Sequence, residues 1–120
     1  MNPHAQEKRQ YSRVILAAPL YVRTLDPQHR FSGICDTLDV GPRGALLRMP
    51  CELPRGTRLR LDVTHADRTA EAEVVSCERG GRRWWKVRVR LLWRDASFWG
   101  MKRMASDWER PTSEDQIWIG

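Results

Sequence analysis

The chain has 120 residues, of which 41% are hydrophobic and 30% charged, and a formal net charge of +6. This length fits one domain that can fold alone. The longest apolar stretch, residues 14–22, is too short to cross a bilayer and contains Pro19, and it lies too far from the start for a signal peptide. We therefore expect a cytoplasmic protein that does not insert into membranes.

The three cysteines, Cys35, Cys51 and Cys77, are odd in number and widely spaced. This spacing fits neither a metal knuckle nor a redox pair. Each cysteine lies beside apolar residues, so we expect three small buried thiols, no metal site and no cofactor.

The amino-terminal third predicts a leader and two strands. Residues 1–13 have no apolar periodicity and predict a flexible basic leader. Residues 14–22 predict a first strand, in which Pro19 indicates an edge position or a bulge. A turn at 26–29 then precedes a second strand at 31–38, and the following residues 39–44 are rich in turn formers.

Four further strands are predicted from alternating apolar and charged residues. The last strand shows the alternation best, with Trp85, Val87, Val89 and Leu91 expected to point inward. Two glycines within 79–82 predict a hairpin turn with positive φ. Short strands joined by turns, with almost no helical period, predict an antiparallel all-β barrel or sandwich. The four strands are placed at 45–49, 57–63, 70–77 and 84–92.

After Arg94 the alternation ends. The expected organisation is a leader at 1–13, a β-domain at 14–108 with a short irregular or helical segment near its end, and a tail at 109–120. The tail is polar except for the apolar run Ile117-Trp118-Ile119. We find no internal repeat and no sign of a second domain.

Enzymatic chemistry is not indicated by the sequence. Nucleophile-elbow, zincin and phosphate-loop motifs are missing from it. The three histidines, His4, His29 and His65, fall in the predicted leader or loops without ligand spacing. We therefore predict a binding protein and not an enzyme.

Two short motifs flank the first strands. Arg9 and Arg13 are four residues apart just before the first strand, and Asp39, Gly41 and Gly44 lie between the second and third. Together, in this order, they resemble the PilZ family, whose signatures are Arg-x-x-x-Arg and Asp/Asn-x-Ser-x-x-Gly. The run Phe98-Trp-Gly100 followed by Asp107-Trp108 is similar to the ending of one PilZ subset. The resemblance spans about residues 7–108.

This resemblance implies a six-stranded antiparallel β-barrel that binds the bacterial second messenger cyclic di-GMP without catalysis and relays the signal to an unidentified effector protein. Arg9 and Arg13 would grip guanine O6 and N7 or phosphate, and Asp39 would accept from guanine N–H groups. Gly44 would let the backbone approach the ligand closely or take a positive φ. Lys8 and Arg43, beside the motifs, are further candidates to touch phosphate.

Gly41 departs from the family pattern, which has serine there. Losing one hydroxyl removes about 0.5–1.5 kcal/mol of binding free energy, so binding is expected to weaken and not to disappear.

Arg88 and Arg90 could line the same surface, although a solvated outer strand face is the simpler interpretation. Among the six tryptophans, Trp93, Trp99 and Trp108 are expected to close one end of the barrel, while Trp84 is expected to face outward.

Two alternatives remain open from the sequence. One is a degenerate PilZ-like adaptor that binds only protein. The other is a small barrel that binds single-stranded nucleic acid through arginines and aromatics. Acidic residues among the outward arginines (Asp62, Glu71 and Glu73) make nucleic acid the less favoured partner. The oligomeric state is not indicated.

Overall fold

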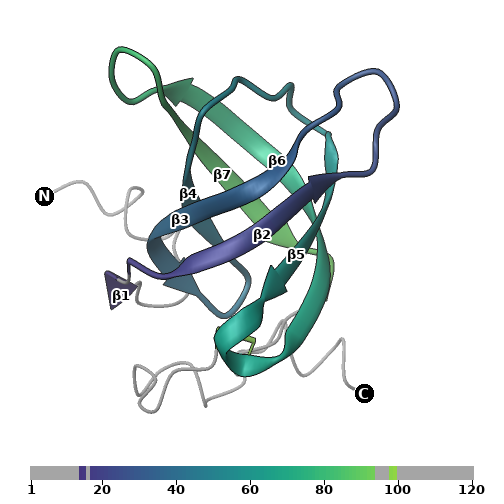
Figure 1. Cartoon of the computed structure of the whole chain (residues 1–120), viewed down its shortest axis with the longest axis vertical. Coiled ribbons are helices and arrows are strands. Elements are labelled where there is room, and N and C mark those ends of the chain that lie inside the picture. Colours follow the sequence, from purple (N-terminus) through teal and green to yellow (C-terminus); the bar gives the residue numbers. More distant parts are fainter. Residues whose placement is uncertain (1–13, 16, 94–97, 100–120) are drawn as a thin grey trace, which may run out of the picture.

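Six strands close into an antiparallel β-barrel in the computed structural model, which describes residues 14–15, 17–93 and 98–99 (Figure 1). Around the barrel the order is β3-β2-β5-β6-β7-β4, and pairing of β3 with β4 completes the circle. The two-residue strand β1 (Val14–Ile15) lies against β3 outside this circle. The barrel strands are β2 (Pro19–Thr24), β3 (Ser32–Gly41), β4 (Gly44–Met49), β5 (Arg58–Val63), β6 (Arg68–Arg79) and β7 (Trp85–Leu91).

The predicted six-stranded barrel is confirmed. Inward side chains of the alternating strands fill its core, as the fully buried Leu59, Leu61, Val87 and Val89 illustrate. Because consecutive strands are antiparallel, the β3–β4 turn and the 3₁₀ helix η1 (Thr64–Ala66) lie at the same end of the barrel. Within the described residues no helix is long and apolar enough to span a membrane.

The first predicted strand is in fact two. β1 ends at Ile15, and β2 begins only at Pro19, which as the first residue of a strand loses no ladder hydrogen bond. The second predicted strand is longer than expected, because β3 continues to Gly41 while pairing with both β1 and β4. The predicted turn at 39–44 therefore shrinks to Pro42 and Arg43.

The β6–β7 hairpin differs from its prediction in backbone conformation. Among the described glycines only Gly56 has a positive φ, so the expectation for Gly80 and Gly81 was wrong. Both are glycine for steric reasons, since a Cβ at either would lie 2.2–2.3 Å from the Trp84 ring. The centre of that ring also lies 4.4 Å from the guanidinium of Arg48 on β4, so Trp84 contacts both the hairpin glycines and β4.

The cysteines are free thiols with unequal burial. Cys35 is buried as predicted, and desolvation raises its pKa to about 12. Cys51 and Cys77 are only half-buried, although both pack against the core. Burial also raises the pKa of the Cys51 thiol.

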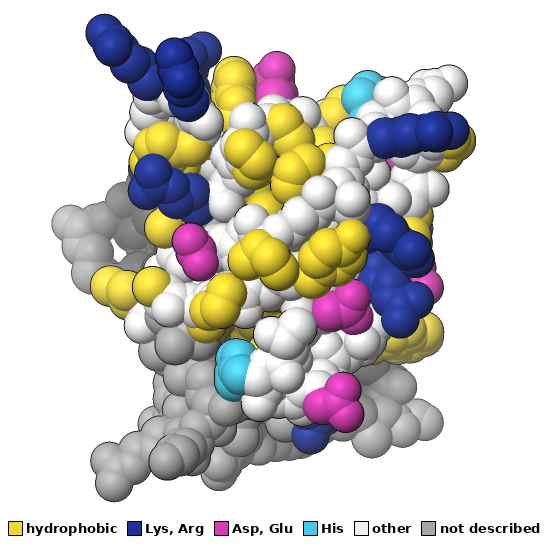
Figure 2. Space-filling view, viewed as in Figure 1, with side chains coloured by type: hydrophobic (Ala, Val, Ile, Leu, Met, Phe, Trp, Pro, Cys, Tyr) yellow, Lys and Arg dark blue, Asp and Glu magenta, His cyan; other side chains and the backbone are white. Residues whose placement is uncertain are grey.

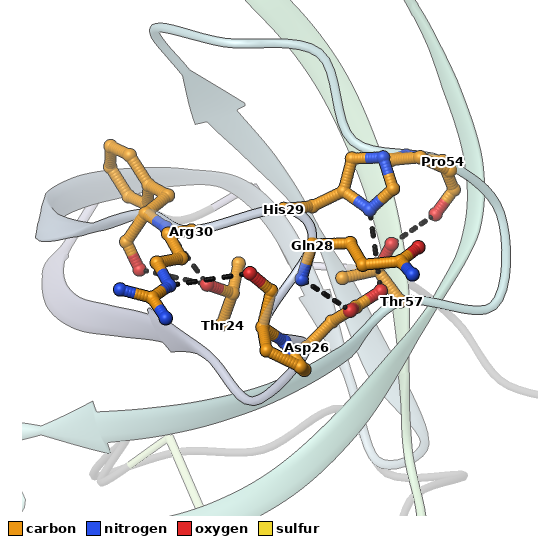
Figure 3. Close-up of polar contacts among 9 residues, drawn as sticks. Thr24, Asp26, Gln28, His29, Arg30, Pro54 and Thr57 are labelled. Carbon is orange, nitrogen blue, oxygen red and sulfur yellow. Dashed lines mark hydrogen bonds and ion pairs between the residues drawn. The ribbon is translucent and has the colours of Figure 1, made fainter.

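The β2–β3 turn is held by Asp26, as Figure 3 shows. The Gln28 amide donates to Asp26 Oδ1 at 2.9 Å, and His29 Nδ1 lies 3.3 Å from Oδ2. These contacts, the amide first, lower the pKa of Asp26. Arg30 Nε donates to the Pro27 carbonyl at 3.2 Å.

Candidate ligand-binding site

A β-bulge brings Asp39 to the outside of the barrel. The β3–β4 register shifts between Thr37 and Asp39. Strict alternation would place both on one face, yet Thr37 is buried and Asp39 is partly exposed. The extra residue, Leu38, therefore reverses the facing of the strand, which is a common role of bulges beside functional sites.

Asp39 is paired with an arginine from another strand. Arg88 Nη1 donates to Asp39 Oδ1 at 3.1 Å, and the two side chains are 24% and 20% exposed. The register explains the contact, because Asp39 lies opposite Leu46 on β4 and Leu46 lies opposite Arg88 on β7. This row offers a carboxylate acceptor, a half-buried apolar side chain and a guanidinium side by side.

The β3–β4 turn next to this row has a two-residue loop, the commonest length in β-hairpins. Gly41 pairs directly with Gly44, so only Pro42 and Arg43 form the turn. The Arg43 carbonyl accepts a hydrogen bond from the Leu91 amide at 2.6 Å, which ties the turn to the end of β7.

Gly44 is required by packing rather than by φ. A Cβ there would lie 2.1 Å from the Val89 carbonyl oxygen, a backbone atom that cannot swing aside. Its φ is not in the left-handed region, so of the two predicted roles the positive φ was wrong. The close approach is to the neighbouring strand of the barrel.

Trp99 closes the barrel beneath the turn. It is buried, and its indole Nε1 donates to the Gly41 carbonyl at 2.7 Å. Phe98 packs edge-on against it with ring centroids 4.8 Å apart. His65 Nε2 lies 3.0 Å from the Trp99 carbonyl oxygen and donates to it from η1. The end-closing role predicted for Trp99 is confirmed, whereas Trp93 is 77% exposed and does not close the barrel.

A family model described as PilZ domain matches residues 7–97. This chain belongs to the PilZ domain family. In general, PilZ domains are non-catalytic modules that bind cyclic di-GMP. The chain matches none of the curated proteins with which it was compared.

The structure brings some predicted PilZ motif residues together. Asp39, Gly41, Arg43 and Gly44 lie within one turn and the strand ends that flank it. Lys8, Arg9 and Arg13 lie outside the described residues, as do Asp107 and Trp108. The described residues therefore include the second PilZ motif but not the arginine motif of the leader.

Arg88 lies beside the motif turn through a contact that sequence reasoning undervalued. The alternation of β7 placed it outward, but its pairing with Asp39 depends on two strand registers. Arg90, by contrast, donates to Glu73 at 2.8 Å, and Arg58 lies 3.5 Å from the same carboxylate. Arg90 therefore belongs to a surface ion-pair network next to the site.

Among the described side chains, no group of three or more His, Cys, Asp and Glu could hold a metal ion. His65 is engaged with Trp99, and His29 with Asp26. His4 lies outside the described residues.

Proposed function

We propose that this PilZ domain binds cyclic di-GMP on the outer face of β3, β4 and β7 and relays its occupancy to an effector protein in the cytoplasm, without catalysing a reaction. The observation that carries the proposal is the Asp39–Arg88 pair beside the motif turn. A guanine base needs both an acceptor for its N–H groups and donors for O6 and N7. This pair supplies both kinds of group on one surface.

Chain connectivity supports a ligand held between this face and the leader. Val14 pairs with Val40, and Ile15 with Asp39. Arg13 is bonded to Val14, so its Cα lies about 3.8 Å from that of Val14. Arg9, five residues before Val14, is at most about 18 Å away along the chain. Both arginines can therefore reach a ligand that contacts Asp39.

The barrel side of the site is already organised. The Asp39 carboxylate is oriented by Arg88, and the turn is fixed by Gly44 packing and by the Trp99 hydrogen bond. A pre-formed surface avoids part of the entropic cost of binding. Leu46, half-buried between Asp39 and Arg88, offers a flat apolar contact for a base or ribose.

A protein-only adaptor is the second candidate, because Gly41 lacks the serine hydroxyl of the family motif. The Gly41 carbonyl already accepts a hydrogen bond from Trp99, so this oxygen does not replace the serine hydroxyl as an acceptor for the ligand. Nucleic-acid binding is less favoured, since Arg58, Arg88 and Arg90 all make ion pairs with carboxylates on the barrel.

Nitrogen-15 NMR titration with cyclic di-GMP tests the proposed location. We expect amide shifts concentrated from Asp39 to Gly44 and at Arg88, with small shifts at the opposite end of β3 near Ser32. Shifts centred on Ser32 would contradict the location, and a spectrum that does not change at all would favour the adaptor.

A further inference from the structure

A second outer face of the barrel combines exposed apolar and basic side chains. On β3, β2 and β5, Ile34 lies opposite Tyr21, and in the next outward row Arg23 lies opposite Arg60. We call these four residues the β2 patch. The apolar side chain of Ile34 is 64% exposed to solvent. Figure 2, seen from the same side as Figure 1, shows hydrophobic side chains gathered across β2 and β3 with Lys and Arg groups beside them.

The two arginines of the β2 patch differ in their surroundings, because Arg60 lies opposite Glu71 on β6 whereas Arg23 lies opposite Arg60 and Ser32. Like charges directly opposite each other on neighbouring strands are unfavourable. Arg60 has a long contact of 3.7 Å with Asp62, but the described part of the chain contains no ion pair of Arg23. Exposed apolar area beside Arg23, which makes no ion pair within the described residues, fits an occupant that carries both carboxylates and bulky apolar residues.

The β2 patch continues into a hollow that is bordered by η1, the element that contacts Trp99. Tyr21 and Ile34 line a depression of about 370 Å³ together with Thr64 of η1. The neighbouring η1 residue, His65, binds the Trp99 carbonyl at 3.0 Å. The polypeptide that follows Trp99 therefore starts on the element that borders the hollow.

The carboxyl-terminal sequence has the composition that the β2 patch requires. Glu114 and Asp115 are followed by the apolar run Ile117-Trp118-Ile119. A chain of about 15 residues, which separates Trp99 from Glu114, spans roughly 20 Å on average as a coil. In register, Tyr21 lies two residues and Arg23 four residues along β5 from the start of η1, which is about 7 to 13 Å. The segment can reach the patch without being stretched.

We propose that residues 114–119 of the same chain bind the β2 patch, with Glu114 and Asp115 facing Arg23 and Arg60 and the apolar run on Tyr21 and Ile34. A tether of this length gives an effective concentration on the order of millimolar, so even a weak contact is populated. An effector that uses this face must then displace the segment. The inference does not depend on cyclic di-GMP binding.

Photo-crosslinking in the full-length protein tests this proposal. With p-benzoylphenylalanine at position 34, we expect irradiation to link this residue to 114–119 within monomers, as mapped by mass spectrometry. The same photo-residue at Val75, which is 38% exposed on β6, is the control and should not give this product. Crosslinks only to other segments, or only between two molecules, would overturn the proposal.

Charge reversal separates a specific contact from random collision. Replacing Glu114 and Asp115 by arginine should lower the crosslink yield several-fold, and adding Arg23→Glu should restore it. Arg82→Glu, in the exposed β6–β7 hairpin, is the matched control and should not restore the yield. The assigned contact is contradicted if the arginine replacements leave the crosslink yield unchanged. It is also contradicted if Arg23→Glu and Arg82→Glu restore the yield equally.

Discussion

The two ends of β3 present opposite kinds of surface. At the Asp39 end the charges are paired across strands, and glycine packing makes the turn rigid. At the Ser32 end two arginines face each other and Ile34 is exposed. A paired, rigid surface suits a small ligand whose groups replace existing contacts. An exposed apolar surface beside like charges suits a polypeptide whose carboxylates neutralise the arginines and whose apolar side chains cover the surface.

The largest expected effect comes from the leader arginines. Arg9→Ala and Arg13→Ala should each weaken cyclic di-GMP binding by about 1–3 kcal/mol, because each removes a base or phosphate contact. Together they should abolish measurable binding while the melting temperature stays unchanged. Arg23→Ala is the matched control at the other end of β3. If it weakened binding as strongly as Arg13→Ala, the two ends would not be functionally distinct.

Steric strain at Gly44 should be next in size. Gly44→Ala should destabilise the barrel by about 3 kcal/mol, the upper part of the overpacking range, because the new Cβ meets backbone. Gly33→Ala is the comparison at the other end, where the Cβ would lie 3.2 Å from the movable Phe31 ring. Urea denaturation should show a clearly smaller loss for Gly33→Ala. Equal losses would refute the packing explanation for Gly44.

The hydrogen bond from Trp99 to Gly41 should contribute to stability at the Asp39 end. Trp99→Phe keeps an aromatic ring but leaves a buried carbonyl without its donor, which costs about 1–3 kcal/mol. Trp93→Phe, at a 77% exposed position, should change the free energy of unfolding by less than about 0.5 kcal/mol. Chemical denaturation of both variants provides the measurement, and similar values would argue against the bond's importance.

Asp39 should matter less than the arginines for affinity. Asp39→Ala should weaken cyclic di-GMP binding about tenfold, equivalent to about 1.4 kcal/mol. Asp36→Ala is the control, since Asp36 is an exposed carboxylate on the same strand but pairs in register with Arg48. Fluorescence titration with a labelled ligand would compare them. An Asp36 effect as large as that of Asp39 would move the site along β3.

The smallest predicted change is a gain. Gly41→Ser restores the hydroxyl of the family motif and should tighten binding by at most about tenfold. The same titration measures it. Unchanged or weaker binding would indicate that position 41 does not face the ligand, and would contradict a site that includes both Gly41 and Asp39.

The barrel could be predicted from sequence because alternation is a local signal. In residues 58–63 every second side chain is apolar, and those side chains are the ones that the core buries. A turn between the second and third strands could likewise be predicted from neighbouring residues, although it is shorter than 39–44 and Asp39 and Gly44 lie in the flanking strands. The break between β1 and β2 was not predicted, because Pro19 is compatible with both a bulge and a strand start.

The long-range contacts of the site could not be predicted. The Asp39–Arg88 pair joins residues 49 apart, and the Trp99–Gly41 bond joins residues 58 apart. Both depend on strand register, and the bulge at Leu38 shifts that register by one residue and reverses the face of Asp39. A single inserted residue of this kind leaves no periodic signal in the sequence.

Isothermal titration of the purified full-length protein with cyclic di-GMP, with GMP as the control ligand, tests the central claim most directly. The account predicts saturable binding in the micromolar range or tighter that is not seen with GMP. No detectable heat with cyclic di-GMP at high protein concentration would contradict it, and would identify Gly41 as the mark of a PilZ domain that binds protein alone.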